Sequence, residues 1–502
     1  MGLVRGYSSG VQVTLRLRFL LDTNVLIPLQ DSYQVLESNL ANFVRLANFG
    51  GHQLLYHPAT EADFRRDQDE QRRRRNLQRL TQYSQLDNPA PCPWNTPQTS
   101  SNDACDNEIL YALECDAAHA LVTEDRGIHA KARTLGLRDR VYTIQMAEDW
   151  LRRLHEPKQV VLPNIEDVPL HSLTPQLPTE FFDSLRLGYP GFDNWFRRKA
   201  RDDRRAWIYR DEHGHVAALC VYAVQTGEPI NDAQVRLDGD ALKLCTFKVG
   251  EKVRGRKIGE LFLKAAFRYA TERACEHLFI HANAERHDYL LRLLEDFGFA
   301  QRGTYNGDHV LVKAHPRVAP EVTGIEPLEY VRLYFPHYRH DAAVQKFIVP
   351  IQPQYHDILL PDYRPHQGRL FAAHNNVGNA IKLAYLCHAP MNAIKPGDIL
   401  LFYRTLDEKA VTSIGVVDKF KVLQDAAEIA SLVSRRTVYS QAEIEAMAAT
   451  QTKVILFRLV EHLPQQVSYT QLQRDCDIAG PIQSIRRVQD AQFTKILNSA
   501  GR

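Results

Sequence analysis

The sequence has little that would mark a secreted or membrane protein. Its eight cysteines are scattered over 502 residues, and no two of them form a CxxC pair. This scatter argues against a disulfide scaffold and a structural zinc site, and it favours a reducing compartment. No apolar run reaches the roughly 18 residues that cross a bilayer, and the N-terminus lacks a signal-peptide pattern. We therefore expect a cytoplasmic protein that does not bind membranes.

An excess of one charge is also absent, because the formal net charge is only +2. Electrostatics alone therefore does not predict nucleic-acid binding, although a local basic face stays open. The histidines form no HExxH or similar pair, and no internal repeat is found. With 44% hydrophobic and 24% charged residues, the chain is expected to be globular and to fold as about three domains.

An apolar run in LRLRFLLDTNVLI ends abruptly at Asp22, and a helix-like pattern follows. Open α/β sheets bind ligands at the carboxyl ends of buried parallel strands, so Asp22 is a candidate ligand-binding residue. Alternatively, Asp22 only caps the following helix. The stretch ALVTEDRGIHAKA repeats the arrangement, with a short apolar strand before Asp125. Two acids at strand ends in one domain suggest a carboxylate metal site.

These two stretches resemble the first and last motifs of PIN-domain nucleases, over residues 12–155. The resemblance implies a parallel α/β sheet and an RNA-hydrolysing site that holds Mg²⁺ or Mn²⁺, hard cations that prefer oxygen ligands. Asp103 lies one helical turn before the third predicted acid and is kept in reserve, and the second acid could instead only complement its helix dipole. The implied catalytic and metal-binding residues are Asp22, Glu61, Asp106 and Asp125.

The densest positive cluster of the sequence is the run Arg72–Arg75. Because Asp67, Asp69 and Glu70 directly precede it, a solvated helix of mixed charge is one interpretation. The other is a face that contacts phosphates, in which Arg72 and Arg73 would bind nucleic acid.

Five prolines between residues 156 and 178 forbid a long helix and predict an extended linker. A second linker is predicted at residues 316–327. These boundaries define a middle domain at residues 179–315 and a C-terminal domain at residues 328–502.

The middle domain has a strand, helix and strand pattern around KVRGRKIGELF that resembles GNAT N-acetyltransferases. The resemblance implies an α/β fold in which a loop and a helix N-terminus hold the pyrophosphate of acetyl-CoA. Two residues depart from the family pattern: Lys257 replaces the middle glycine, and Leu294 stands where a tyrosine general acid is frequent. Active acetyl transfer and a degenerate scaffold are therefore both open. The implied cofactor-binding residues are Val249, Arg254, Gly255, Arg256, Lys257, Gly259 and Asn283.

The C-terminal domain contains KPGDILLFYRT and VTSIGVVDKF, which resemble PUA-like β-barrels of the ASCH and EVE type. The resemblance implies binding of RNA or modified bases. Lys382, Tyr403 and Arg404 suit phosphate contact and base stacking, and we predict them as nucleic-acid contacts. Alternatively, they are ordinary residues of the barrel wall.

Taken together, the patterns predict a multidomain protein with a PIN-like sheet, a GNAT-like domain and a PUA-like barrel. The first functional hypothesis is a metal-dependent ribonuclease that acts on RNA, with a toxin role and an antitoxin partner implied by the resemblance. The second is an N-acetyltransferase directed at RNA or tRNA, in which the PIN-like domain only binds. The third is a non-catalytic scaffold that senses modified nucleic acid.

Overall fold

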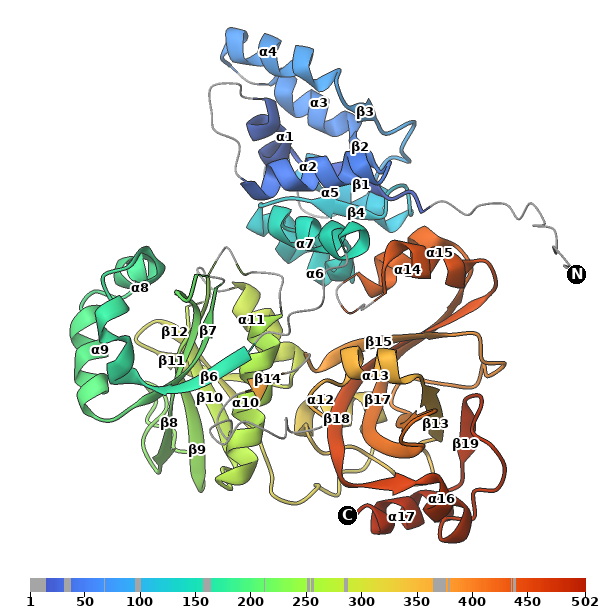
Figure 1. Cartoon of the computed structure of the whole chain (residues 1–502). Helices are drawn as coiled ribbons and strands as arrows, with labels where there is room; N and C mark the ends of the chain where they lie inside the picture. The colour runs from blue at the N-terminus through green and yellow to red at the C-terminus, as the bar shows by residue number, and fades with distance from the viewer. Residues whose placement is uncertain are drawn as a thin grey trace, which may run out of the picture. The chain divides into compact units, whose positions relative to one another are not determined.

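The computed structural model describes residues 15–30, 38–66, 68–94, 101–156, 164–211, 213–250, 253, 257–283, 288–363, 376–377, 380–434, 436 and 439–502. The chain forms two compact units (Figure 1). Unit 1 comprises residues 1–159, 386–388 and 422–454, and unit 2 comprises residues 160–385, 389–421 and 455–502.

Unit 1 is built on a five-stranded sheet in the order β3-β2-β1-β4-β5. Every pairing in this sheet is parallel. Parallel strands are covered on both faces, which explains why the run before Asp22 is continuously apolar. The parallel α/β sheet predicted for this region is therefore confirmed. Its strands are β1 (Arg18–Leu21), β2 (Gln53–Tyr56), β3 (Ser84–Gln85), β4 (Ala120–Val122) and β5 (Val141–Tyr142).

Helices cover both faces of this sheet, as the alternation of β1 side chains shows. Phe19 packs edge-on against Phe43 and Trp150, at centroid distances of 5.4 and 5.3 Å. Leu20 points the other way, into a cluster with Ile109 and Ile128. The helices are α1 (Thr23–Gln30), α2 (Ser38–Phe49), α3 (Pro58–Arg65), α4 (Glu70–Leu80), α5 (Ser101–Glu114), α6 (Arg126–Thr134) and α7 (Ile144–His155).

Two helices from the distant end of the chain complete unit 1, namely α14 (Ala426–Val433) and α15 (Gln441–Ala448). The hydroxyl groups of Tyr142 and Ser434 lie 2.5 Å apart in a buried hydrogen bond. Arg153 donates to the carbonyl oxygen of Ser434 at 2.9 Å. No local pattern in the sequence predicted this association.

The first sheet of unit 2 has eight strands in the order β11-β12-β10-β9-β8-β7-β6-β14. Strands β9 and β10 are parallel, and the other pairings are antiparallel. The strands are β6 (Asn164–Pro169), β7 (Arg205–Arg210), β8 (Val216–Thr226), β9 (Asp240–Val249), β10 (His277–Ala282), β11 (Ala300–Tyr305), β12 (Asp308–Ala314) and β14 (Asn376–Val377).

Different helices pack on the two faces of this sheet. On one face, α10 (Ile258–Glu272) and α11 (Asp288–Asp296) share a core with alternate residues of β9 and β10. On the other, α8 (Asp183–Gly188) and α9 (Phe192–Arg201) pack on β7 and β8. Helix α10 is the crossover that parallel neighbours such as β9 and β10 require.

The predicted linker at residues 156–178 is wrong for its second half. Residues 164–169 form β6, which pairs with β7, and Leu170–Gln176 form the 3₁₀ helix η2. Leu170 and Leu173 are buried in the domain core. Prolines are compatible with this because Pro169 ends its strand and Pro175 lies in a short 3₁₀ segment, so neither interrupts a long helix or a central strand.

The second sheet of unit 2 has six strands in the order β15-β18-β17-β16-β13-β19. Strand β13 runs parallel to β16 and antiparallel to β19. The closure of this sheet into a barrel stays a prediction. Its strands are β13 (Lys346–Ile351), β15 (Lys382–Cys387), β16 (Ile399–Arg404), β17 (Ala410–Leu423), β18 (Thr452–Ser468) and β19 (Arg486–Val488), with helices α12 (Pro327–Tyr334), α13 (Pro353–Leu359), α16 (Tyr469–Arg474) and α17 (Asp490–Ser499).

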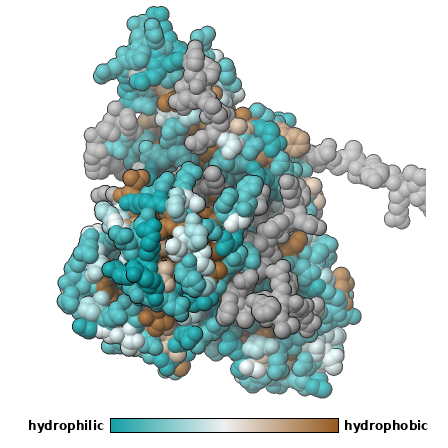
Figure 2. All heavy atoms as spheres, turned by 60° about the vertical axis from the view of Figure 1, so that its left-hand side comes forward, coloured by the Kyte–Doolittle hydropathy of each residue, from teal (hydrophilic) through white to brown (hydrophobic). Residues whose placement is uncertain are grey.

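Within the residues that the structure describes, no helix is long and apolar enough to cross a bilayer. The face seen in Figure 2 is mostly hydrophilic, with small separate hydrophobic areas.

Candidate functional site

The parallel strands β9 and β10 separate at their carboxyl ends. Their pairing runs from Ala241–His277 to Leu244–Ile280 and extends no further in the described residues. Strand β9 nevertheless continues to Val249 along β8. We call the end regions 245–249 and 281–283 the β9–β10 fork. Carboxyl ends of parallel strands are where α/β sheets receive ligands, so the fork is the candidate site.

A β-bulge lies where the fork begins. The register between β8 and β9 shifts between the Val221–Thr246 and Tyr222–Leu244 pairs, so Cys245 is the extra residue. A bulge bends its strand and increases its twist, which explains how β9 leaves β10 while it stays paired with β8. No motif of the sequence marks Cys245.

The N-terminus of α10 lies at the same edge as the fork, because α10 follows β9 and leads to β10. Lys257 precedes the helix in the left-handed conformation, with φ of 57°. Its ammonium group donates to the carbonyl oxygen of Lys382 at 2.9 Å. The N–H groups and dipole of a helix N-terminus favour phosphate. The predicted loop residues Arg254, Gly255 and Arg256 lie outside the described residues.

Gly259 lets α10 and α11 approach closely. A Cβ atom at this position would lie 2.7 Å from Cδ2 of Leu293. Of the other predicted cofactor-binding residues, Val249 ends β9 and Asn283 follows β10, both half-buried. The four described predictions, including Lys257, therefore lie at one edge of the sheet. Their contact with a cofactor stays a prediction.

A proton donor is missing at the position where the sequence departed from the family pattern. Leu294 is fully buried in the core between the sheet and α11. Tyr289 lies at the start of α11 and is 57% exposed. At the fork, burial and nearby Lys243 lower the pKa of His281 to about 4. Its ring is therefore neutral at pH 7 and a weak base.

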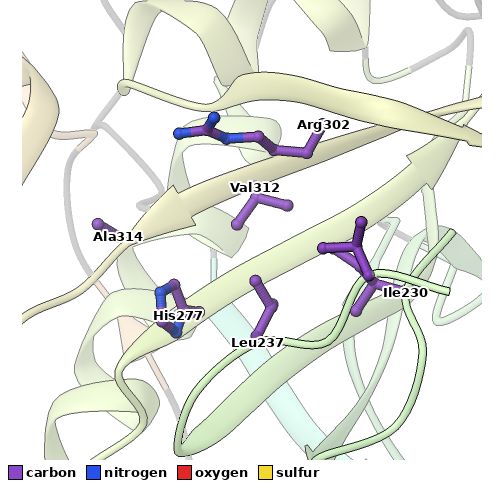
Figure 3. Close-up of a pocket in the computed structure, with 7 residues that line it drawn as sticks. Ile230, Leu237, His277, Arg302, Val312 and Ala314 are labelled. Carbon is purple, nitrogen blue, oxygen red and sulfur yellow. The ribbon is translucent and has the colours of Figure 1, made fainter. Parts of the chain in front are cut away.

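A cavity of about 280 Å³ lies on the opposite face of the same sheet, lined by Ile230, Leu237, His277, Arg302 and Val312 among others (Figure 3). His277 begins β10, whereas the fork begins after Ile280. Across the strands, however, Nε2 of His281 in the fork lies 2.9 Å from the carbonyl oxygen of Ile230, which lines the cavity. The cavity therefore borders the candidate site.

In unit 1, Asp22 lies at the carboxyl end of β1, as predicted, and is buried. Its carboxylate accepts hydrogen bonds from Thr123 Oγ1 at 2.6 Å, Asn24 Nδ2 at 2.7 Å and Thr23 N at 2.7 Å. Burial raises the pKa of Asp22, and repulsion from Asp106 and Asp125 adds to this effect. These three predicted acids therefore lie close enough to influence one another.

The other predicted metal ligands are engaged with protein donors. Asp106 lies 3.0 Å from Lys131 Nζ, and Asp103 lies 2.8 Å from the same atom. Asp125 caps α6 by accepting from the N–H groups of residues 127 and 128. Glu61 accepts from Gln85 at 3.1 Å and pairs with Arg65.

The predicted Mg²⁺ or Mn²⁺ site is therefore not supported. In the described part of the chain, no group of three His, Cys, Asp or Glu side chains could hold a metal ion. The carboxylates already have other partners: the ammonium group of Lys131 lies beside Asp106, and backbone N–H groups donate to Asp125. The helix-cap alternative was raised for Asp22, but it is Asp125 whose side chain caps a helix.

Two predicted nucleic-acid contacts in the C-terminal domain, Tyr403 and Arg404, are buried, and their role with nucleic acid stays a prediction. Tyr403 lies in the core of the second sheet, with 5% exposure. Arg404 is bound by Asp357 and by Asp407. The hydrogen bonds to Asp407 are the main cause that raises the pKa of Arg404. Neither side chain presents a surface for stacking or phosphate.

Lys382 is likewise a link inside unit 2 rather than a surface contact. Its ammonium group lies 2.9 Å from Asp296 Oδ2 at the end of α11. Its backbone N–H donates to Glu260 of α10 at 3.2 Å. In unit 1, Arg72 is exposed and Arg73 half-buried on α4. Their role with nucleic acid stays a prediction.

A buried chain of polar groups occupies the second sheet. A bulge at Thr412 in β17 turns Thr412 and Ser413 toward His356 and His462, at 2.8 Å in each case. His462 Nε2 in turn lies 3.1 Å from Asp362. A serine, histidine and carboxylate in this order can activate a nucleophile. Ser413 is fully buried, however, and so has no access to a substrate.

Comparison with protein families matches residues 168–299 to the Acetyltransferase (GNAT) family. The matched region runs from the end of β6 to the residue before β11. Comparison with curated proteins finds no match.

Several solved structures resemble parts of the chain. The GNAT family N-acetyltransferase YhbS from Escherichia coli, in complex with CoA, is 14% identical over 32% of this chain and 85% of that chain, with a TM-score of 0.23. A GNAT acetyltransferase from Staphylococcus aureus MU50 is 15% identical over 30% of this chain and 98% of that chain, with a TM-score of 0.23. ASCH from Zymomonas mobilis is 15% identical over 30% of this chain and 94% of that chain, with a TM-score of 0.23.

The family match includes strand β9, helix α10 and strand β10, and therefore both arms of the β9–β10 fork. The resemblance predicted for the middle domain is thereby confirmed at the level of the family. Residues 168–299 of this chain form a GNAT acetyltransferase domain.

Proposed function

We propose that this chain transfers the acetyl group of acetyl-CoA to an amine. The observation that carries the proposal is the β9–β10 fork with the N-terminus of α10 at the same edge. Acetyl-CoA supplies an acetyl thioester and a pyrophosphate. The chain would bind the pyrophosphate at the start of α10. It would bind the extended amide-containing arm along β9 beyond Leu244, in the manner of an added strand.

The side chains near the fork define what the chain contributes. Lys257 can approach a phosphate if it leaves the carbonyl oxygen of Lys382, which it contacts at 2.9 Å. Leu294 cannot donate a proton, so the departing thiolate would take its proton from water or from another group. Binding and orientation are therefore the main contributions that we assign to the chain.

A binding measurement with a matched pair of variants tests the proposal. Gly259→Glu places a carboxylate and a larger side chain in the first turn of α10, where the nearest atom is 2.7 Å from a Cβ. We expect it to abolish acetyl-CoA binding in calorimetry. Glu272→Gln, at the exposed other end of α10, is the control and should bind normally. Equal binding by both variants would remove α10 from the site.

The second candidate is the predicted PIN-type ribonuclease, with its implied toxin role. Support comes from the parallel sheet of unit 1 and from the repulsion that Asp106 and Asp125 exert on Asp22. The engaged carboxylates do not fit a metal ion, so we derive no step through one. Incubation of the protein and of Asp22→Asn with cellular RNA and Mn²⁺ tests it, with exposed Asp87→Asn as the control. RNA left intact by all three would end this candidate.

A further inference from the structure

Helix α9 has one apolar face and one strongly basic face. Phe192, Phe196 and Ala200, spaced four residues apart, are buried against the sheet. The opposite face exposes Arg197, Arg198 and Arg201. Figure 2 brings the α8–α9 side of the domain forward and shows mainly hydrophilic residues there. An amphipathic helix explains the apolar face, but it does not explain why the polar face is mostly arginine.

The positive charge on this face is poorly balanced. In the described residues, Arg197 and Arg198 form no ion pair, and Arg201 contacts only the carbonyl oxygen of Arg197, at 3.4 Å. Asp193 is engaged elsewhere, with its carboxylate 3.1 Å from Arg186. Asp202 interacts electrostatically with Arg198 and offsets part of the charge.

Two further basic residues lie near this face, Lys199 in the last turn of α9 and Arg204 just after the helix. Lys199 pairs with Asp202 at 2.8 Å, and the pKa of Asp202 is lowered mainly by that hydrogen bond. Burial lowers the pKa of Lys243 on β9, and repulsion from Arg204 and Lys199 lowers it further. Like charges in one region cost free energy unless anions offset them. We call the exposed residues Arg197, Arg198 and Arg201 the α9 basic face.

The α8–α9 hairpin borders the β9–β10 fork. Near the end of β9, Lys248 donates to Ser184 Oγ at 2.7 Å and to the carbonyl oxygen of Phe181. Its ammonium group also lies 4.5 Å from the centre of the Phe181 ring. The start of α8 is therefore fixed to the arm of β9 that separates from β10. Helix α9 follows α8 after Tyr189.

We propose that the α9 basic face binds the phosphate backbone of RNA and positions an RNA-borne amine at the fork. The second half of this statement rests on the proposed acetyl transfer, whereas the first half does not. Arginine forks match phosphate oxygens in pairs, which lysine cannot do. Half-buried Trp195 of the same helix is stacked on Phe192 and belongs to the core side of the helix, so the arginines alone carry the proposed contact.

RNA fits this face better than an acidic protein does. Protein interfaces have an apolar core, and among its described residues α9 exposes no large hydrophobic side chain. Leu187, on α8, is 82% exposed and is the one large apolar side chain of the hairpin that could serve a protein partner.

The test is binding of a fluorescent single-stranded RNA to the full chain, followed by anisotropy over a range of salt concentrations. We compare wild type with the triple variant R197Q/R198Q/R201Q. Each phosphate contact to a single strand contributes about 0.7 to the slope of log K against log salt. Loss of three contacts should therefore lower the slope by about 2 and weaken binding about 100-fold at 0.1 M salt.

A second triple variant, R268Q/R317Q/R474Q, removes the same charge from exposed sites of unit 2 that have acidic partners. It should bind RNA nearly as wild type does. Melting curves and acetyl-CoA titrations of both triples should match wild type, which separates loss of RNA binding from loss of acetyl-CoA binding. The single variant R198E repeats the test with less disturbance of the helix.

Three results would overturn the proposal. The first is absence of RNA binding by wild type, and the second is equal weakening by the two triple variants. The third is competition by polyglutamate that equals competition by RNA at the same charge concentration, which would assign the face to an acidic protein. Failure of acetyl transfer with RNA binding intact would instead count against the proposed function alone.

Discussion

Lys313 of β12 is fully buried and predicts an unusual dependence of stability on pH. Its ammonium group donates to the carbonyl oxygens of Arg332 and Leu333, at 3.2 and 2.5 Å. Burial, followed by repulsion from Arg458, lowers the pKa of Lys313 from 10.5 to about 7. Between these two values, the unfolded chain holds a proton at this lysine that the folded chain has released.

The sign follows from proton linkage. Because the unfolded state binds more protons between pH 7 and 10.5, the free energy of unfolding should rise with pH in this window and level off below it. The slope is about 1.4 kcal/mol per pH unit. From pH 7.5 to 9.5, the Lys313 contribution should therefore rise by about 3 kcal/mol. Lys313→Met removes the titrating group and should lose this rise.

Hydrogen exchange of β12, measured by mass spectrometry and corrected for intrinsic rates, reads this local free energy without requiring two-state unfolding of the whole chain. Lys495→Met is the control, because Lys495 lies on the surface and pairs with Asp477. If wild type and Lys313→Met show the same pH slope, Lys313 stays protonated in the folded state. The two carbonyl oxygens would then outweigh its burial, and the reasoning would be refuted.

Three further substitutions test the packing. Gly298→Ala places a Cβ 2.4 Å from the backbone carbonyl oxygen of Arg332 at φ of +80°, so the free energy of unfolding should fall by about 2–4 kcal/mol. Gly214→Ala, at a similar φ but in open space, should lower it by about 1 kcal/mol. Tyr142→Phe loses the buried bond to Ser434 and should weaken exchange protection of α14 by about 1 kcal/mol; unchanged protection would refute this. Arg404→Met leaves Asp357, Asp407 and Glu408 without their partner and should destabilise unit 2 by about 2 kcal/mol in thermal melts; a neutral result would show that those acids are solvated.

The parallel sheet of unit 1 could be predicted because a strand covered on both faces leaves a continuous apolar run, and the run before Asp22 ends where the strand ends. The fork was only partly predictable. The pattern after β9 indicates a strand followed by a phosphate-binding helix start, but the bulge at Cys245 depends on the register with β8 and has no local signature.

Other features could not be predicted because they depend on contacts between distant residues, or on the face of a strand from which a side chain projects. The Tyr142–Ser434 contact joins residues 292 apart, and no periodic pattern records such a pair. Arg404 could have been recognised as structural, because Asp407 lies three residues further along the chain. The apolar run ILLFY before it shows no alternation, and such a run is typical of a strand buried on both faces. The four predicted metal ligands lie in the expected elements, but Asp106 pairs with Lys131 of a different helix. Asp125 and Glu61 are instead engaged by donors of their own helices.

The most direct test of acetyl transfer is the release of free CoA from acetyl-CoA by the full chain, with and without RNA as a source of amines. The account predicts that wild type binds acetyl-CoA with a dissociation constant below about 1 mM and releases CoA faster when an acceptor is present, and that Gly259→Glu does neither. A wild-type protein that binds no acetyl-CoA at this concentration would contradict the account.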